Sequence, residues 1–333
     1  MGIVSKSSRA RGFFSNFTEK ELLFLTKFIT KASFEAGDLI ISQGCFSEYL
    51  YIIETGQVAV YITLPGDSIK QKSILVESQI FSEVAFLTDD LTTATIVAKT
   101  SVNCLLLKRA VLNALRILYP EIAFKIEYAI AKQTNQKIIC DGSQLINTLL
   151  TLQTNHNLYS DHAHSLPSNK ATYQELNIKA INRQLLDKLA FLNALTKAQI
   201  DKLLTFMQVK LYDRGYQLNE QILGKIGLVF SGAVMFFLAK EKNLIKSIGI
   251  ISIGDLFLQQ FFTQNLKSVF EFVTCEESII LELDINQYQQ LKHTEPEIFY
   301  KLSQYVHTAF VHWLSIINRQ CIRINCEYLN FTS

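Results

Sequence analysis

Hydrophobic and polar positions follow two different periods in the first part of the chain. Between residues 18 and 31, apolar side chains recur every three or four positions, which predicts a helix with one buried face. Thr18 and Glu21 stand at its start and predict a capping box. From Phe34 onward the period shortens to two, and short apolar runs end at turn residues such as Gly56. This spacing predicts an antiparallel barrel or jelly roll.

Helical periodicity returns at residues 109–133, where Pro120 divides it into two predicted helices. Residues 13–133 are therefore predicted to form a mainly β domain with flanking α-helices (α+β). The small, polar and basic residues 1–12 predict a flexible N-terminus. Residues 134–186 include a polar stretch and predict a connector of helix and loop.

The second half of the chain repeats the first at a nearly constant offset. Phe257 stands 176 positions after Phe81, and Gly232 stands 176 positions after Gly56. Earlier in the repeat, Gly215 stands 178 positions after Gly37. A short deletion in one loop explains the single change of offset. A repeat of this length indicates two copies of one domain, each a β-roll or jelly-roll barrel. We therefore predict the second copy at residues 187–304, and a C-terminal helix and tail at 305–333.

Composition and charge restrict the class of protein. The chain has 333 residues, 49% of them hydrophobic, and a net charge of +2. These values allow two globular domains and give no reason to expect a nucleic-acid or anionic-membrane partner. The six cysteines have no paired spacing, which favours a reducing compartment. The sequence has no apolar run of about 18 residues, so we expect no transmembrane helix and a cytoplasmic protein.

Residues 81–98 combine features that suit a phosphorylated sugar. An apolar strand end is followed by Glu83, a short apolar turn, a polar loop, and then Thr92 and Thr93 before the next strand. The start of a helical turn presents unpaired N–H groups and a positive dipole end, which favour an anion. Glu83 is placed to accept hydrogen bonds from sugar hydroxyls.

This segment resembles the phosphate-binding cassette of the cyclic nucleotide-binding domain family. The residues that fall on the family pattern without a gap are Phe81, Glu83, Ala85, Leu87, Ala94 and Thr95. The resemblance implies that Glu83 binds the ribose 2′-hydroxyl. Ser82 stands at the family's glycine, and Thr92 stands at the arginine that pairs with the cyclic phosphate. The predicted ligand-binding residues are Ser82, Glu83, Val84, Ala85, Thr92 and Thr93.

The second copy departs further from the family pattern. Gln259 stands at the glutamate position and Ser268 at the arginine position, while the adjacent Lys267 is within reach of a phosphate. Leu258 replaces the glycine that allows the backbone to approach a ligand closely. Gln259, Lys267 and Ser268 therefore form a degenerate second site, in a copy predicted to be a non-binding scaffold.

Three hypotheses for the first copy follow from the missing arginine. A charge-assisted hydrogen bond contributes about 1.5–3 kcal/mol, so its loss predicts weak binding of cyclic AMP or cyclic GMP. A threonine after the family's arginine favours cyclic GMP, and Thr93 stands there. In the second hypothesis, Glu83 binds the ribose of an uncharged nucleoside. In the third, both copies are ligand-free interaction modules, and Glu83 only caps the turn.

We expect a regulatory protein and not an enzyme. The sequence has no Walker A motif, dinucleotide-binding glycine pattern, nucleophile elbow or HExxH motif. Asp161, His162 and His164 lie in a predicted polar loop, where solvent exposure is the usual state of such side chains. We therefore expect neither a metal site nor a bound cofactor.

Two such domains in tandem are similar to the regulatory subunits of protein kinase A. The resemblance implies that helices 109–133 close over the ligand and that the connector passes this change to the second copy. The expected partners are a cyclic nucleotide or nucleoside and an unidentified protein, and the near-neutral charge disfavours DNA. An apolar stripe in the last helix predicts either internal packing or a homodimer contact, and it comprises Leu302, Tyr305, Val306, Phe310, Trp313 and Leu314.

Overall fold

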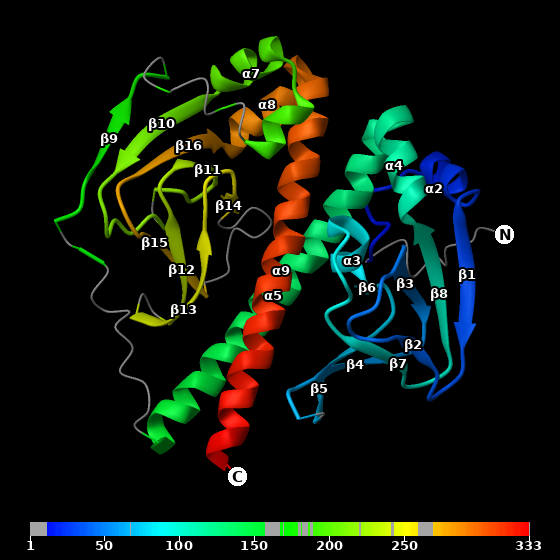
Figure 1. Cartoon of the computed structure of the whole chain (residues 1–333). Helices are drawn as coiled ribbons and strands as arrows, with labels where there is room; N and C mark the ends of the chain where they lie inside the picture. The colour runs from blue at the N-terminus through cyan, green and yellow to red at the C-terminus, as the bar shows by residue number, and fades with distance from the viewer. Residues whose placement is uncertain are drawn as a thin grey trace. The chain divides into compact units, whose positions relative to one another are not determined.

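The computed structural model describes residues 12–66, 68–156, 167–168, 170–178, 181, 186, 189–219, 221–240, 243–258 and 269–332. These residues form two compact units. The first unit combines the described residues up to Ile138 with those from Phe310 onward, and the second extends from Ile139 to Ala309. Figure 1 shows two long helices, α5 (Pro120–His156) and α9 (Pro296–Thr332). The division into units falls within both of them, so each helix contributes residues to both units.

The described strands of the first unit form two open antiparallel sheets of four strands each. One sheet has the order β1 (Ile29–Phe34), β8 (Val102–Lys108), β3 (Tyr49–Thr55) and β6 (Ile80–Phe81). The other has the order β2 (Leu39–Ile41), β7 (Thr95–Ala98), β4 (Val58–Thr63) and β5 (Ile69–Leu75). The predicted jelly-roll class is confirmed, although the two sheets do not close into a barrel.

Helices flank these sheets at both ends of the repeat. α2 (Glu19–Leu25) begins at the predicted capping box, in which the Thr18 and Glu21 side chains each bond to the other's backbone N–H. α4 (Arg109–Leu118) follows β8 directly, and α5 begins at Pro120. α5 then continues without a break to His156, so a helix occupies much of the segment predicted as a connector.

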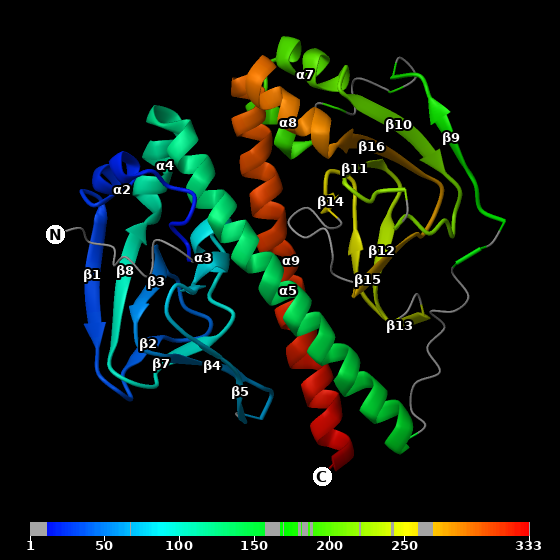
Figure 2. The same cartoon turned by 180° about the vertical axis from the view of Figure 1, so that it is seen from behind.

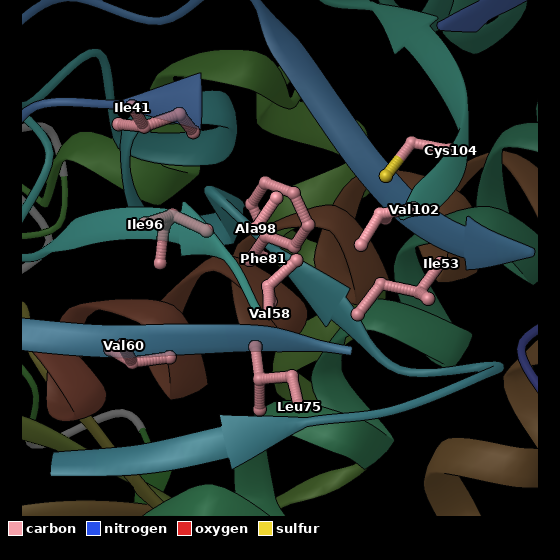
Figure 3. Packing of buried hydrophobic residues seen from close by; sticks show 10 residues of the cluster. All are labelled: Ile41, Ile53, Val58, Val60, Leu75, Phe81, Ile96, Ala98, Val102 and Cys104. Carbon is pink, nitrogen blue, oxygen red and sulfur yellow. The ribbon is translucent and has the colours of Figure 1, made fainter. Parts of the chain in front are cut away.

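The core of the first copy lies between its two sheets. Figure 3 shows ten buried side chains of this cluster, which come from β2 to β8. Phe81 stands among them, and its ring stacks on Tyr51 of β3 with a centroid distance of 4.7 Å and an interplanar angle of 11°. Because Phe81 is the last residue of β6, this packing fixes the position of the turn that follows.

The second copy repeats most of these elements in the same order, but the match of β2 among its described residues is an isolated bridge between Gln217 and Val273. Its described strands form one sheet of β14 (Leu256–Leu258), β11 (Lys225–Ser231), β16 (Ser278–Asp284), β10 (Met207–Tyr212) and β9 (Tyr173–Leu176), and a second of β13 (Asn243–Ile251), β12 (Val234–Lys240) and β15 (Phe270–Thr274). Its flanking helices are η3 (Ala190–Ala194), α7 (Lys197–Leu204), α8 (Ile285–Thr294) and α9. Three pairs of elements begin at matched positions of the two copies and are equal in length, namely β8 and β16, α4 and α8, and α5 and α9.

Local chemistry recurs with the elements. Thr196 and Gln199 form the second predicted capping box at the start of α7. Gly56 and Gly232 both have positive φ, of 90° and 86°, at matched turns. One difference is β9, which comes from the segment predicted as a connector and pairs with β10 as an additional strand. Across the part of the chain described, no helix is long and apolar enough to cross a membrane.

Candidate ligand-binding site

The predicted cassette lies between β6 and β7 of the first copy. It consists of Ser82, the short helix α3 (Glu83–Thr88) and the loop that ends at Thr93 (Figure 1, Figure 2). Val84 and Ala85 belong to α3 and are buried, with 4% and 0% of their surface exposed. Their side chains anchor α3 in the core, so they hold the turn in place and leave polar contacts to their neighbours.

Ser82 adopts the left-handed conformation that favours glycine, with φ 71° and ψ 12°. For a residue with a side chain this conformation costs about 1–2 kcal/mol. The Ser82 Oγ is buried and has no hydrogen-bond partner among the described residues. A buried hydroxyl without a partner is uncommon, and here it stands at the position that the resemblance assigns to the ligand.

Glu83 is buried and forms an ion pair with a residue from α5. Its Oε1 accepts a hydrogen bond from Lys137 Nζ at 2.5 Å, and 4% of the residue is exposed. Lys137 Nζ also donates to the backbone oxygen of Ile80, at 2.8 Å. The contacts described for Glu83 all use Oε1. Since a carboxylate accepts through both oxygens, Oε2 retains its capacity for a donor.

A second residue of α5 holds the strand that leads into the cassette. Gln133 Oε1 accepts from the backbone N–H of Ile80 at 3.1 Å, and its Nε2 donates to the backbone oxygen of Ser78 at 2.9 Å. Gln133 and Lys137 stand four positions apart, so one face of α5 makes both contacts. The helix predicted to close over the ligand is therefore hydrogen-bonded directly to the predicted binding segment.

Thr92, at the family's arginine position, turns toward the loop of residues 42–45. Its Oγ1 lies 2.6 Å from the backbone oxygen of Ser42 and 3.0 Å from that of Cys45, and it accepts from the Cys45 N–H at 3.1 Å. Backbone groups therefore use the donor and acceptor capacity of this hydroxyl. Thr92 supplies a loop contact in this structure, and it brings no charge to the cassette.

Thr93 contacts the end of α9 within the first unit. Asn318 Nδ2 donates to Thr93 Oγ1 at 3.0 Å, and Asn318 Oδ1 accepts from Lys72 Nζ of β5 at 2.5 Å. Two positions earlier on β5, Lys70 Nζ donates to Asn325 Oδ1 at 2.5 Å. Asn318, which lies 225 positions after Thr93, thus connects the end of the cassette to Lys72 of β5.

Arg109, the first residue of α4, supports the opposite end of α3. Its Nη2 donates to the backbone oxygens of Ser47 at 2.8 Å and Ala85 at 2.7 Å, and its Nη1 pairs with Asp89. These bonds connect the cassette helix to the first closing helix. The contacts of Arg109 are with the protein itself, so this cation acts as a clamp on α3.

The structure therefore brings Ser82, Glu83, Val84 and Ala85 together, and places Thr93 beside α9 and Thr92 in the neighbouring loop. Sequence reasoning missed Lys137, Lys72 and Asn318. The sequence repeat contains one signal for Lys137. At the matched positions of the second copy, Gln259 replaces Glu83 and Trp313 replaces Lys137, so both members of the ion pair are lost together.

The second predicted site, Gln259, Lys267 and Ser268, lies outside the described residues, as do Asp161, His162 and His164. The strand that leads into the second site, β14, is described. Phe257 pairs with Gly227, and a Cβ added to Gly227 would lie 2.4 Å from Cζ of Phe257. Over the described part of the chain, no cluster of histidine, cysteine and carboxylate side chains is suited to a metal ion.

Comparison with known proteins identifies the first copy. The family model described as "Cyclic nucleotide-binding domain" matches residues 31–117. A cGMP-dependent protein kinase of Plasmodium berghei is 32% identical over 100 residues, which are 30% of this chain and 11% of that protein. The chain thus matches a small part of that kinase's length.

Solved structures with similarity to the chain include proteins with bound cAMP. The structure of cAMP-bound PfPKA-R has 16% identity and a TM-score of 0.31, covering 87% of this chain and 82% of that one. The regulatory domain of Toxoplasma gondii PKA with cAMP has 13% identity and a TM-score of 0.31, covering 90% and 94%. The Thermus thermophilus catabolite activator protein has 20% identity and a TM-score of 0.34, covering 46% and 76%.

Proposed function

Because residues 31–117 belong to the cyclic nucleotide-binding domain family, we propose that the first copy binds a cyclic nucleotide, cAMP or cGMP, in a non-catalytic regulatory protein of the cytoplasm. Glu83 binds the ribose, and the phosphate lies beside Ser82 and Thr93. The second copy serves as scaffold. The closing helices pass the bound state on to an unidentified protein partner.

The observation that carries this proposal is the state of the Glu83 carboxylate. It is buried, it is held by Lys137 through Oε1, and its described contacts leave Oε2 without a donor. A ribose 2′-hydroxyl can donate to Oε2 while the ion pair remains. The carboxylate is then already oriented before the ligand arrives, which reduces the entropy lost on binding.

The relay rests on the same contacts. Lys137 bonds to both Glu83 and Ile80, and Gln133 bonds to Ile80 and Ser78, so the ligand segment and α5 share one hydrogen-bond network. A ligand shifts a conformational equilibrium only by its differential affinity for the two states. A sugar hydroxyl on Glu83 changes the strength of the Lys137 pair, and this is the differential interaction through which the ligand biases α5.

Calorimetric titration and thermal-shift measurements on the full chain test the proposal. The ligands are cAMP, cGMP, adenosine, guanosine and inosine, and the variants are Glu83→Ala and the control Glu48→Ala, an exposed carboxylate in an ion pair with Lys108. We expect a cyclic nucleotide to bind, Glu83→Ala to abolish binding and Glu48→Ala to retain it. Absence of binding by every ligand up to millimolar concentration would contradict the proposal.

A second candidate function has its own observation in support. Glu83, Thr92 and Thr93 each have a hydrogen-bond partner within the chain, so the cassette is stable without a ligand. This favours a protein-interaction scaffold, as in the third hypothesis from the sequence. The same titration separates the candidates, since a scaffold binds none of the five ligands. A response to nucleosides alone would instead favour a nucleoside-binding module.

A further inference from the structure

The proposed site lacks a cation inside the cassette, because Thr92 stands where the family has arginine. We propose that Lys72 and Asn318 together replace that arginine as the phosphate-binding pair of the first copy. This inference rests on the proposed function and names the residues that recognise the negative charge of the ligand. Lys72 comes from β5 and Asn318 from α9, and both belong to the first unit.

Lys72 is directed toward the cassette by an irregularity of the sheet. In the β4–β5 pairing, Val60 pairs with Ser73 and Tyr61 pairs with Gln71, so Lys72 is an extra residue at a bulge. A bulge changes the direction of a side chain relative to the regular strand. The Lys72 ammonium then reaches Asn318 Oδ1 at 2.5 Å.

Hydrogen-bond chemistry determines the orientation of the Asn318 amide. An ammonium group only donates, so it bonds the amide oxygen and leaves the NH₂ group facing Thr93. Asn318 is 8% exposed, and its Nδ2 lies 3.0 Å from Thr93 Oγ1. A phosphate oxygen beside Thr93 therefore meets an N–H donor whose dipole is aligned by a positive charge behind it. Such charge-assisted bonds are stronger than neutral ones.

The second copy has the same backbone feature without the same chemistry. Its bulge recurs at the matched position, between the pairs Phe236–Gly249 and Phe237–Ser247, and the extra residue there is Ile248, which is 2% exposed. The position of Asn318 corresponds to Gly142 of α5, where an added Cβ would lie 2.9 Å from Cζ of Phe270. At both positions the second copy packs apolar groups closely.

The contrast separates a structural role from a ligand role. If the fold itself required a lysine–asparagine contact at these two matched positions, both copies would carry it, whereas the second copy has Ile248 and Gly142 there. Lys72 and Asn318 occur together in the unit that contains Glu83, whereas the matched positions of the second unit hold Ile248 and Gly142. The pair therefore accompanies the ribose-binding carboxylate.

The decisive variant is Asn318→Asp, which is isosteric. Aspartate keeps a bond to Lys72 as an ion pair, so the end of α9 stays in place, but an oxygen replaces the NH₂ group that faces Thr93. Calorimetry on the full chain should show cyclic nucleotide affinity falling about a hundredfold. The affinity for the matching nucleoside, which carries no phosphate, should be unchanged. Lys72→Met should lower the affinity for the cyclic nucleotide about tenfold, and Lys72→Arg should have the affinity of the native chain.

Lys70→Met is the matched control, because Lys70 lies on the same strand and bonds to Asn325 of the same helix. It should leave both affinities unchanged. Equal affinities of Asn318→Asp, Lys72→Met and Lys70→Met for the cyclic nucleotide would overturn the inference and leave the proposed function standing. Equal losses for the nucleotide and the nucleoside would overturn it in favour of a structural role. A wild-type protein that binds neither ligand would overturn both proposals.

Discussion

At the scale of single residues, the buried Glu83–Lys137 ion pair contributes to the stability of the first copy. The Glu83 side chain is 6% exposed, so its charge depends on Lys137 for compensation. Lys137→Met leaves a buried carboxylate without a cation and should lower the free energy of unfolding by about 3 kcal/mol. Adding Glu83→Gln to Lys137→Met should recover part of this loss, because the remaining amide is neutral. Urea unfolding of the four proteins in the cycle measures both effects.

Lys31→Met is the control for this cycle. Lys31 pairs with Glu54 at 2.8 Å, but half of its side chain is exposed, so its removal should cost below about 1 kcal/mol. A similar cost for Lys137→Met and Lys31→Met would show that the Glu83 charge is compensated elsewhere.

Cys104 provides a residue-scale prediction with a pH dependence. It is fully buried in the core, and burial raises the pKa of its thiol from 9.0 to about 12. The folded state therefore holds a proton that the unfolded chain releases above pH 9, so stability should fall as pH rises from 9 toward 12. The slope contributed by this group is about 1.4 kcal/mol per pH unit.

Urea midpoints at pH 8 and pH 10.5, compared between the native chain and Cys104→Ala, measure this slope. The variant should be less stable at pH 8 because of the cavity, and its stability should depend less on pH. Thiol labelling at pH 8 should modify Cys45 and Cys140, which are exposed, before Cys104. Equal rates for all three thiols would contradict the burial of Cys104.

At the scale of elements, the turn at Gly56 shows how a short loop fixes the β-sheet. Gly56 has φ +90°, and a Cβ there would lie 2.3 Å from the backbone oxygen of Ser101. Gly37 has a similar φ of +95° with nothing within 4 Å of an added Cβ. Both alanine variants carry the strain of positive φ, about 1 kcal/mol, but only Gly56→Ala forces backbone to move. Gly56→Ala should therefore lower the melting temperature further than Gly37→Ala.

Gly56 and Gly37 share a positive φ, but only Gly56 has backbone atoms close to an added Cβ. A difference between the two alanine variants therefore measures the effect of that close contact. Differential scanning calorimetry on the two variants and the native chain measures the melting temperatures. Equal shifts in melting temperature would show that the turn accommodates a methyl group, and that the glycine is needed for its conformation alone.

Elements defined by neighbouring residues could be predicted from the sequence. The capping boxes at Thr18 and Thr196, the turns at Gly56 and Gly232, and the cassette helix at Glu83 each depend on a few adjacent positions, and all of them form. The fold class and its repeat followed from such signals. The length of α5 beyond residue 133 did not, because polar positions there gave little periodicity and tertiary packing decides the extent of a helix.

The partners of the candidate site could not be predicted in the same way. Lys137 meets Glu83 across 54 positions, and Asn318 meets Thr93 across 225. No local pattern encodes which polar residue of a long helix will reach a given loop, since the answer depends on the rotation and docking of the helix. Thr92 was predicted to face a phosphate, and its engagement with Ser42 and Cys45 depends on a loop 50 positions earlier.

At the scale of the whole molecule, the C-terminal part of each long helix belongs to the unit of the other copy. The described part of α9 from Phe310 onward belongs to the unit of the first copy, and α5 from Ile139 onward belongs to the unit of the second. The apolar stripe of the last helix is buried in the chain at Leu302, Val306, Phe310, Trp313 and Leu314. Internal packing therefore uses these side chains, and a homodimer through this helix stays a prediction.

Shortening the chain tests this exchange. Removing residues 310–333 takes away the side chains that contact β5 and Thr93, although the cut lies far along the chain from both. Hydrogen exchange should become about tenfold faster in β5 and around Thr93, while β11 and β16 of the second copy keep their protection, because local stability follows local contacts. A chain that ends at Cys326 is the control, since it retains Asn318 and Asn325 and should exchange like the full chain. Loss of protection confined to the second copy would contradict the assignment of the α9 end to the first unit.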